Sequence, residues 1–255
     1  MPRKAFLPAL SMPMLVLLTL PLLALVLRVD VRSLLDNLGS ETVRQALALS
    51  VTTGSITTLL TLIFGTPLAL LLGRRSFRGR TVIDTLVDLP IVLPPAVAGI
   101  ALLLVFGRRG WLGPGLEILG VQVVFTPVAV VLAQLFVAAP FYIRSAAAGF
   151  AEIDTELEQA AALDGAGEFA VFRHVTAALA WPAIAGGAVM TWARAIGEFG
   201  ATIIFAGNFP GRTQTMPLAI YLGFERDLDL AVTLAFLLLS ASFAVLVIVK
   251  RILGE

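Results

Sequence analysis

Long apolar stretches separated by short polar connections run along most of this chain. A helix needs about 20 mostly apolar residues to cross a bilayer. Six stretches reach that length, at residues 6–27, 43–72, 82–106, 123–148, 177–205 and 230–249. A further apolar piece at 216–224 is too short to span, and we expect it against the bundle, at the interface or in an ordinary loop. The pattern predicts an all-α membrane protein with six transmembrane helices.

Small, hydroxyl and proline residues modify two of these stretches. The second carries a face of small and hydroxyl residues, namely Ser50, Gly54, Thr57 and Thr61. Such a face indicates either close helix packing or a hydrophilic path. The third contains a group of helix-bending residues, namely Pro90, Pro94, Pro95 and Gly99. We expect the third helix to bend there, since proline removes a backbone donor and clashes with the preceding turn.

Lysines and arginines near the ends of the stretches predict the orientation. With a cytoplasmic N-terminus, ten of these residues, beginning with Arg3 and Lys4, fall on the inner side and seven on the outer side. The densest cluster is Arg74, Arg75, Arg78 and Arg80, in one short connection. We therefore expect that connection inside, residues 107–122 outside, and both termini in the cytoplasm.

Composition supports a single membrane domain and excludes several functions. Hydrophobic residues make up 58% of the 255 positions and charged residues 14%, against roughly 45–50% and 25% in soluble domains. With no cysteine and one histidine, a cysteine nucleophile and a two-histidine metal site are excluded. A net charge of +1 argues against nucleic acid as a partner. We expect one transmembrane domain over residues 1–255, with no catalytic, cofactor-binding or metal-binding residues.

The longest polar segment, residues 150–176, is rich in acidic side chains. Thr155 followed by Glu158 has the form of a capping box and predicts a helix that begins with Thr155 as its cap. Gly165 supplies a stop, and a second short helical piece can follow at 168–174. The segment is either a docking site for another protein or a solvated acidic loop.

Residues 159–165 resemble the Glu-Ala-Ala segment of ABC importer permeases, in which three residues and a glycine follow that triplet. Ala160, Ala161 and Gly165 match, while Gln159 stands at the glutamate position beside Glu158. Residues 65–69 and 88–99 resemble the second and third spans of such permeases, and residues 106–110, 194–202 and 210–221 resemble the molybdate and tungstate permeases within that family. Sulfate permeases are close relatives, so sulfate remains an alternative substrate.

The resemblance implies a type I permease fold in the inner membrane and alternating access driven by a separate ATPase. It implies a permease homodimer, two ATPase subunits that hold ATP and magnesium, and an extracytoplasmic oxyanion-binding protein. No lysine in this chain follows a glycine, so the Gly-Lys-Ser/Thr of a phosphate-binding loop is missing. The resemblance assigns ATPase coupling to residues of the polar segment, namely Thr155, Glu158, Gln159, Ala160, Ala161, Asp164, Gly165, Phe172 and Arg173.

Four polar residues fall on one face of the fifth stretch at spacings of three, four and four, namely Thr191, Arg194, Glu198 and Thr202. Arg194 and Glu198 can pair at i, i+4. Charges in a membrane face the bundle interior or a water-filled cavity. The stripe is either a pathway or gate for an anion, or a structural pair that closes the outer end of the bundle.

Two other functional classes compete with an ABC permease. Inverted repeats and ionisable residues on several facing spans would favour an ion-coupled secondary transporter. This sequence shows only one clear intramembrane pair, which argues against that class. A membrane enzyme would need further histidines and clustered carboxylates for its chemistry, and this sequence lacks them.

Overall fold

The computed structural model describes the backbone of residues 3–253 and the side chains of residues 10–251, so the side chains of Arg3 and Lys4 lie outside the described part. Within it the chain is all helical, with no strand. The elements are α1 (Arg3–Arg28), α2 (Val31–Leu38), α3 (Glu41–Arg74), α4 (Arg80–Val92), α5 (Pro95–Phe106), α6 (Gly113–Ile118), α7 (Pro127–Ala151), α8 (Thr155–Leu163), α9 (Glu168–Val171), the π-helical turn η1 (Phe172–Thr176), α10 (Ala177–Leu179), α11 (Trp181–Ile196), α12 (Gly200–Phe205), α13 (Met216–Arg226) and α14 (Leu228–Leu253).

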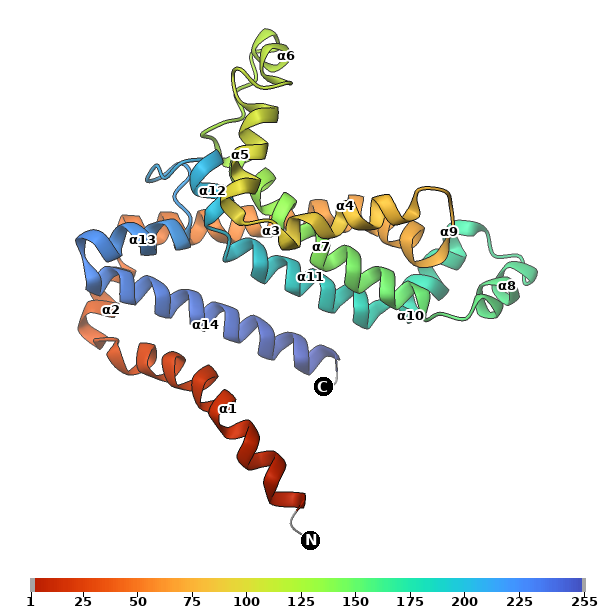
Figure 1. Cartoon of the computed structure of the whole chain (residues 1–255), viewed down its shortest axis with the longest axis horizontal. Coiled ribbons are helices and arrows are strands. Elements are labelled where there is room, and N and C mark those ends of the chain that lie inside the picture. Colours follow the sequence, from red (N-terminus) through yellow and green to blue (C-terminus); the bar gives the residue numbers. More distant parts are fainter. Residues whose placement is uncertain (1–2, 254–255) are drawn as a thin grey trace.

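The core of the bundle is built from α3, α7 and α11, which pack against one another along their length (Figure 1). Small and hydroxyl side chains allow this close approach. Ser50, Thr57 and Thr61 are buried on α3, and the Thr57 hydroxyl lies 3.0 Å from Gln134 Oε1 on α7. These contacts support the close-packing interpretation of the second stretch.

The third expected span is wrong as a single helix. Its two parts, α4 and α5, meet at an angle of 117°, and α5 leads into a projection that α6 completes (Figure 1). Pro94 cannot donate a backbone hydrogen bond, and Pro95 starts the new helix. The predicted bend is therefore present, but it divides the stretch into two helices.

The fifth expected span is divided twice. Residues 168–179 and 181–196 are inclined by 74° to one another across Ala180. A second break, at residues 197–199, separates α11 from α12. Pro182 in the first turn of α11 fits the first break, and the second leaves Glu198 outside both helices.

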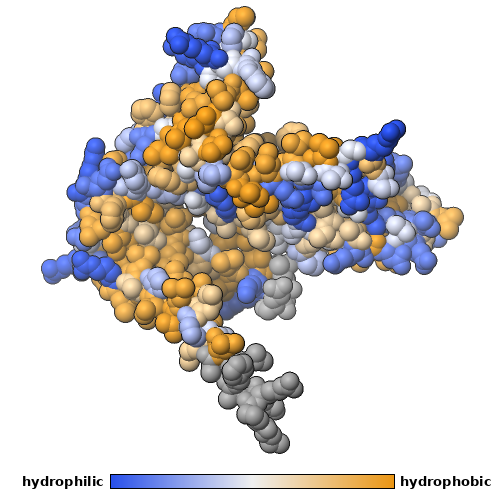
Figure 2. All heavy atoms as spheres, in the orientation of Figure 1, coloured by the Kyte–Doolittle hydropathy of each residue, from blue (hydrophilic) through white to orange (hydrophobic). Residues whose placement is uncertain are grey.

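The described part of the chain has four helices that are each long and apolar enough to cross a membrane, and up to six spans if each bent pair counts as one. Six spans with two cytoplasmic termini therefore remain a prediction. Figure 2 shows apolar residues over the middle of the bundle, with hydrophilic residues gathered around α8 and at the tip of the α6 projection. The short apolar piece became α13, whose Met216 and Leu218 are buried against the bundle.

Candidate functional site

The polar segment forms α8, which stands at one end of the bundle (Figure 1). Asp154 caps it, since its carboxylate accepts a hydrogen bond from the Glu156 N–H at 2.9 Å. The expected capping box is therefore wrong: Thr155 is the first helical residue, and Glu158 does not reach back to it. Asp154 precedes Thr155 by one position, and the Glu158 carboxylate has other partners.

The expected stop at Gly165 is confirmed. Gly165 has a φ of +88°, a left-handed conformation that glycine adopts without steric cost. The N–H of Gly165 bonds to the carbonyl of Ala162 and that of Ala166 to the carbonyl of Ala161. These two bonds form a Schellman motif, which satisfies carbonyls left free at the helix end.

None of the nine residues of α8 is buried. Gln159, Ala160 and Asp164 are exposed, as is Arg173 farther along, whereas Ala161 and Phe172 are half-buried. Two apolar side chains that sequence reasoning missed add to this surface: Leu163 is 88% exposed and Phe169 73%. The available sequence signal was the presence of large apolar residues within an acidic segment, because exposed apolar clusters mark interaction sites.

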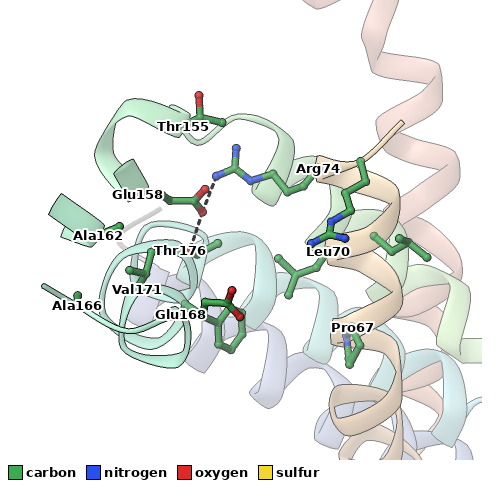
Figure 3. A pocket seen from close by; sticks show the side chains of 13 residues that line it. Pro67, Leu70, Arg74, Thr155, Glu158, Ala162, Ala166, Glu168, Val171 and Thr176 are labelled. Carbon is green, nitrogen blue, oxygen red and sulfur yellow. Dashed lines mark hydrogen bonds and ion pairs between the residues drawn. The ribbon is translucent and has the colours of Figure 1, made fainter. Parts of the chain in front are cut away.

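Glu158 faces the bundle. Its Oε1 lies 2.7 Å from Nη2 of Arg74, at the end of α3, and accepts a hydrogen bond from the Thr176 hydroxyl at 2.6 Å (Figure 3). The Arg74–Glu158 contact lacks good hydrogen-bond alignment, so its attraction is mainly Coulombic. Arg74 Nη1 also donates to the Ile153 carbonyl at 2.6 Å. A cavity of about 700 Å³ opens beside this group, between α3, α8 and α9.

The four residues of the expected intramembrane stripe do not share one helix, because α11 ends at Ile196. Arg194 and Glu198 nevertheless pair as predicted, with 2.7 Å between Nη1 and Oε2. The Glu198 side chain is 1% exposed and that of Arg194 is 30% exposed. The other Glu198 oxygen accepts the N–H of Ala201 at 2.8 Å and so caps α12.

The two threonines of the stripe are both buried. Thr191 donates to the Ala138 carbonyl of α7 at 3.2 Å. Among the described residues the Thr202 hydroxyl has no hydrogen-bond partner. Three of the four side chains are thus buried on either side of the break between α11 and α12, and Arg194 is partly exposed.

A second charged cluster, between α4 and α7, was missed. Arg144 Nε donates to Asp88 at 2.6 Å, and the two Nη atoms bond to the carboxylate and the carbonyl of Asp84. The sequence shows both acids one helical turn apart, at i, i+4, which was the available signal. One arginine facing two carboxylates holds α4 against the core.

Comparison with known proteins places these features in context. The family model described as "Binding-protein-dependent transport system inner membrane component" matches residues 65–253. The molybdenum transport system permease protein of Mycobacterium bovis is 42% identical over 240 residues, covering 93% of this chain and 89% of the relative. The molybdate/tungstate permease protein of Thermococcus kodakarensis is 35% identical, covering 89% and 85%.

The similarities also extend to a sulfate permease and to a solved transporter. The sulfate transport system permease protein of Synechococcus elongatus is 36% identical, covering 84% of this chain and 75% of the relative. A bacterial alginate ABC transporter, solved in complex with an alginate pentasaccharide-bound periplasmic protein, is 18% identical with a TM-score of 0.73. That likeness covers 98% of this chain and 93% of the other and shows a shared fold.

Proposed function

We propose that this chain, which belongs to the binding-protein-dependent transport system inner membrane component family, is the permease subunit of an ATP-driven importer of molybdate or tungstate. The family is one of multi-pass inner membrane proteins that serve as permease subunits of ABC importers. The observation that carries the substrate is the 42% identity, over 93% of the chain, to a molybdenum transport permease.

Energy in this proposal comes from a separate ATPase. ATP and magnesium bind to that partner, and this chain carries no ATPase site of its own. Its docking surface is α8 with the residues that follow, because this helix is exposed, has no buried residue and presents Leu163 and Phe169 to the surroundings. A short helix is marginally stable alone in water, so a partner surface adds to its stability.

Two copies of the chain, two ATPase subunits and an extracytoplasmic oxyanion-binding protein make up the complete importer. The alginate transporter crystallised with its periplasmic protein supports a partner of that last kind. In this proposal Arg194 and Glu198 form a structural pair that joins α11 to α12. Glu198 neutralises the arginine, and a neutralised pair is a poor anion site.

Reconstitution with the ATPase and binding protein tests the proposal. Proteoliposomes that hold the complex should accumulate molybdate only when ATP is supplied. Unlabelled tungstate in excess should compete for uptake, whereas sulfate should not. Competition by sulfate at the same concentration would favour the sulfate alternative, and uptake driven by an ion gradient without ATP would favour a secondary transporter.

A further inference from the structure

Three elements meet at one carboxylate oxygen at the end of the bundle. Glu158 Oε1 on α8 contacts both the guanidinium of Arg74, the last residue of α3, and the hydroxyl of Thr176 in η1 (Figure 3). The distances are 2.7 Å and 2.6 Å. The Arg74 side chain is 15% exposed and that of Glu158 is 26% exposed. This site is therefore largely shielded from solvent, which strengthens its charge interactions.

We propose that Arg74, Glu158 and Thr176 form a positioning clamp that transmits movement of α8 to the membrane helices. This inference rests on the proposed function, since it assigns the route by which ATPase closure reaches the bundle. Glu158 faces Arg74 and Thr176, so it serves within the chain and does not contact the ATPase.

Few contacts attach α8 to the bundle, so the single carboxylate of Glu158 makes a large part of that attachment. No residue of α8 is buried, and only Glu158 and Ala161 are half-buried. The helix thus has little apolar packing to hold it to the bundle. The polar contacts of Glu158 supply the link that apolar packing supplies elsewhere.

The two arms of the clamp lead to different parts of the core. Arg74 ends α3, whose buried face packs against α7. It also donates to the Ile153 carbonyl at 2.6 Å, which ties the start of the polar segment to the same helix. Thr176 ends the π-helical turn that continues through α10 into α11. π-helical turns are often found at functional sites, and α11 carries the Arg194 that pairs with Glu198.

The test compares variants of the clamp with a matched control. Arg74→Met removes the charged guanidinium and keeps an unbranched apolar stem, and Thr176→Val replaces only the hydroxyl with a methyl group. Arg78→Met is the control, because Arg78 is an exposed arginine of the neighbouring connection. Two quantities are measured: amide hydrogen exchange of residues 156–164 in the purified chain, and molybdate taken up per ATP hydrolysed in the reconstituted complex.

We expect Arg74→Met to speed exchange in α8 and to lower uptake per ATP, each about tenfold, because it removes the ion pair with Glu158 together with the charge-assisted hydrogen bond to the Ile153 carbonyl. The ATPase should still co-purify. Arg74→Lys should give intermediate values, since one ammonium replaces a fork that reaches both Glu158 and Ile153. Thr176→Val should lower uptake per ATP, and Thr176→Ser should restore it.

Several results would overturn the clamp. Arg74→Met could match Arg78→Met in both measurements, or it could release the ATPase, which would make Arg74 a docking residue. A wild-type complex that takes up no oxyanion would instead refute the proposed function. Hydrogen exchange in the purified chain would still decide whether Arg74 holds α8.

Discussion

Removing the charge of Arg194 should destabilise the chain more than removing the charge of Glu198. Arg194→Met leaves a carboxylate that is 1% exposed without its cation. Breaking a buried ion pair lowers the free energy of unfolding by about 3–5 kcal/mol. Because the Arg194 side chain is 30% exposed, we expect a loss near the lower end of that range. For a chain of this size, about 3 kcal/mol corresponds to a fall of roughly 6–12 °C in the melting temperature.

Glu198→Gln should cost less, about 1–2 kcal/mol. The amide oxygen can still accept the Ala201 N–H and cap α12, and the remaining guanidinium keeps some access to solvent. The double variant Arg194→Met/Glu198→Gln should be more stable than Arg194→Met alone, because it strands no buried charge.

The assay is the melting temperature of the detergent-purified chain, measured together with its membrane yield and with molybdate uptake. Arg212→Met, a change at an exposed arginine, serves as the control. A double variant at least as unstable as Arg194→Met would refute the reasoning. Normal stability in every variant, with uptake sensitive only to Arg194, would make Arg194 a pathway residue.

Three further predictions concern the rest of the site and the topology. Gly165→Val should weaken ATPase pull-down while Gly165→Asn retains it, because a β-branched residue adopts a φ of +88° poorly; equal pull-down would contradict the turn. Arg144→Met should lower the free energy of unfolding by about 1–2 kcal/mol, a modest loss because Asp84 and Asp88 are partly exposed. Arg144→Lys should have an intermediate stability. An unchanged melting temperature would argue against the link to α4. Single cysteines at Ser76 and Glu156 should resist an impermeant thiol reagent in intact cells and one at Gly115 should react; the reverse pattern would invert the topology.

Long apolar runs could be translated directly into helices, because a bilayer offers no other partner for backbone groups. α3, α7 and α14 follow from that rule. The breaks were harder to predict. The prolines indicated a bend after α4, but not its angle of 117°. At that angle α5 packs against α12. The approach is close, since a Cβ on Gly99 of α5 would lie 2.7 Å from Ile204 Cβ of α12. Such tertiary contacts leave no local pattern.

The candidate site shows the same division between local and distant determinants. Gly165 could be predicted because helix stops are local. The role of Glu158 could not, since its partner Arg74 ends a different helix and displaces the local capping box. The Arg194–Glu198 pair was predicted from spacing, although Glu198 lies beyond the end of α11 and accepts the N–H of Ala201 at the start of α12.

The arrangement of α1 and α14 has a consequence for biosynthesis. The apolar window of α1 is unburied within this chain, and its main contacts are with α14, while Asn37 of α2 donates to Thr233 of α14. The 200 positions from Arg28 to Leu228 take about 10–40 s to translate at about 5–20 residues per second. The contacts of α1 and α2 with α14 can therefore form only after nearly the whole chain has been synthesised. A ribosome that stalls before α14 leaves both the α1–α14 packing and the Asn37–Thr233 hydrogen bond unmade.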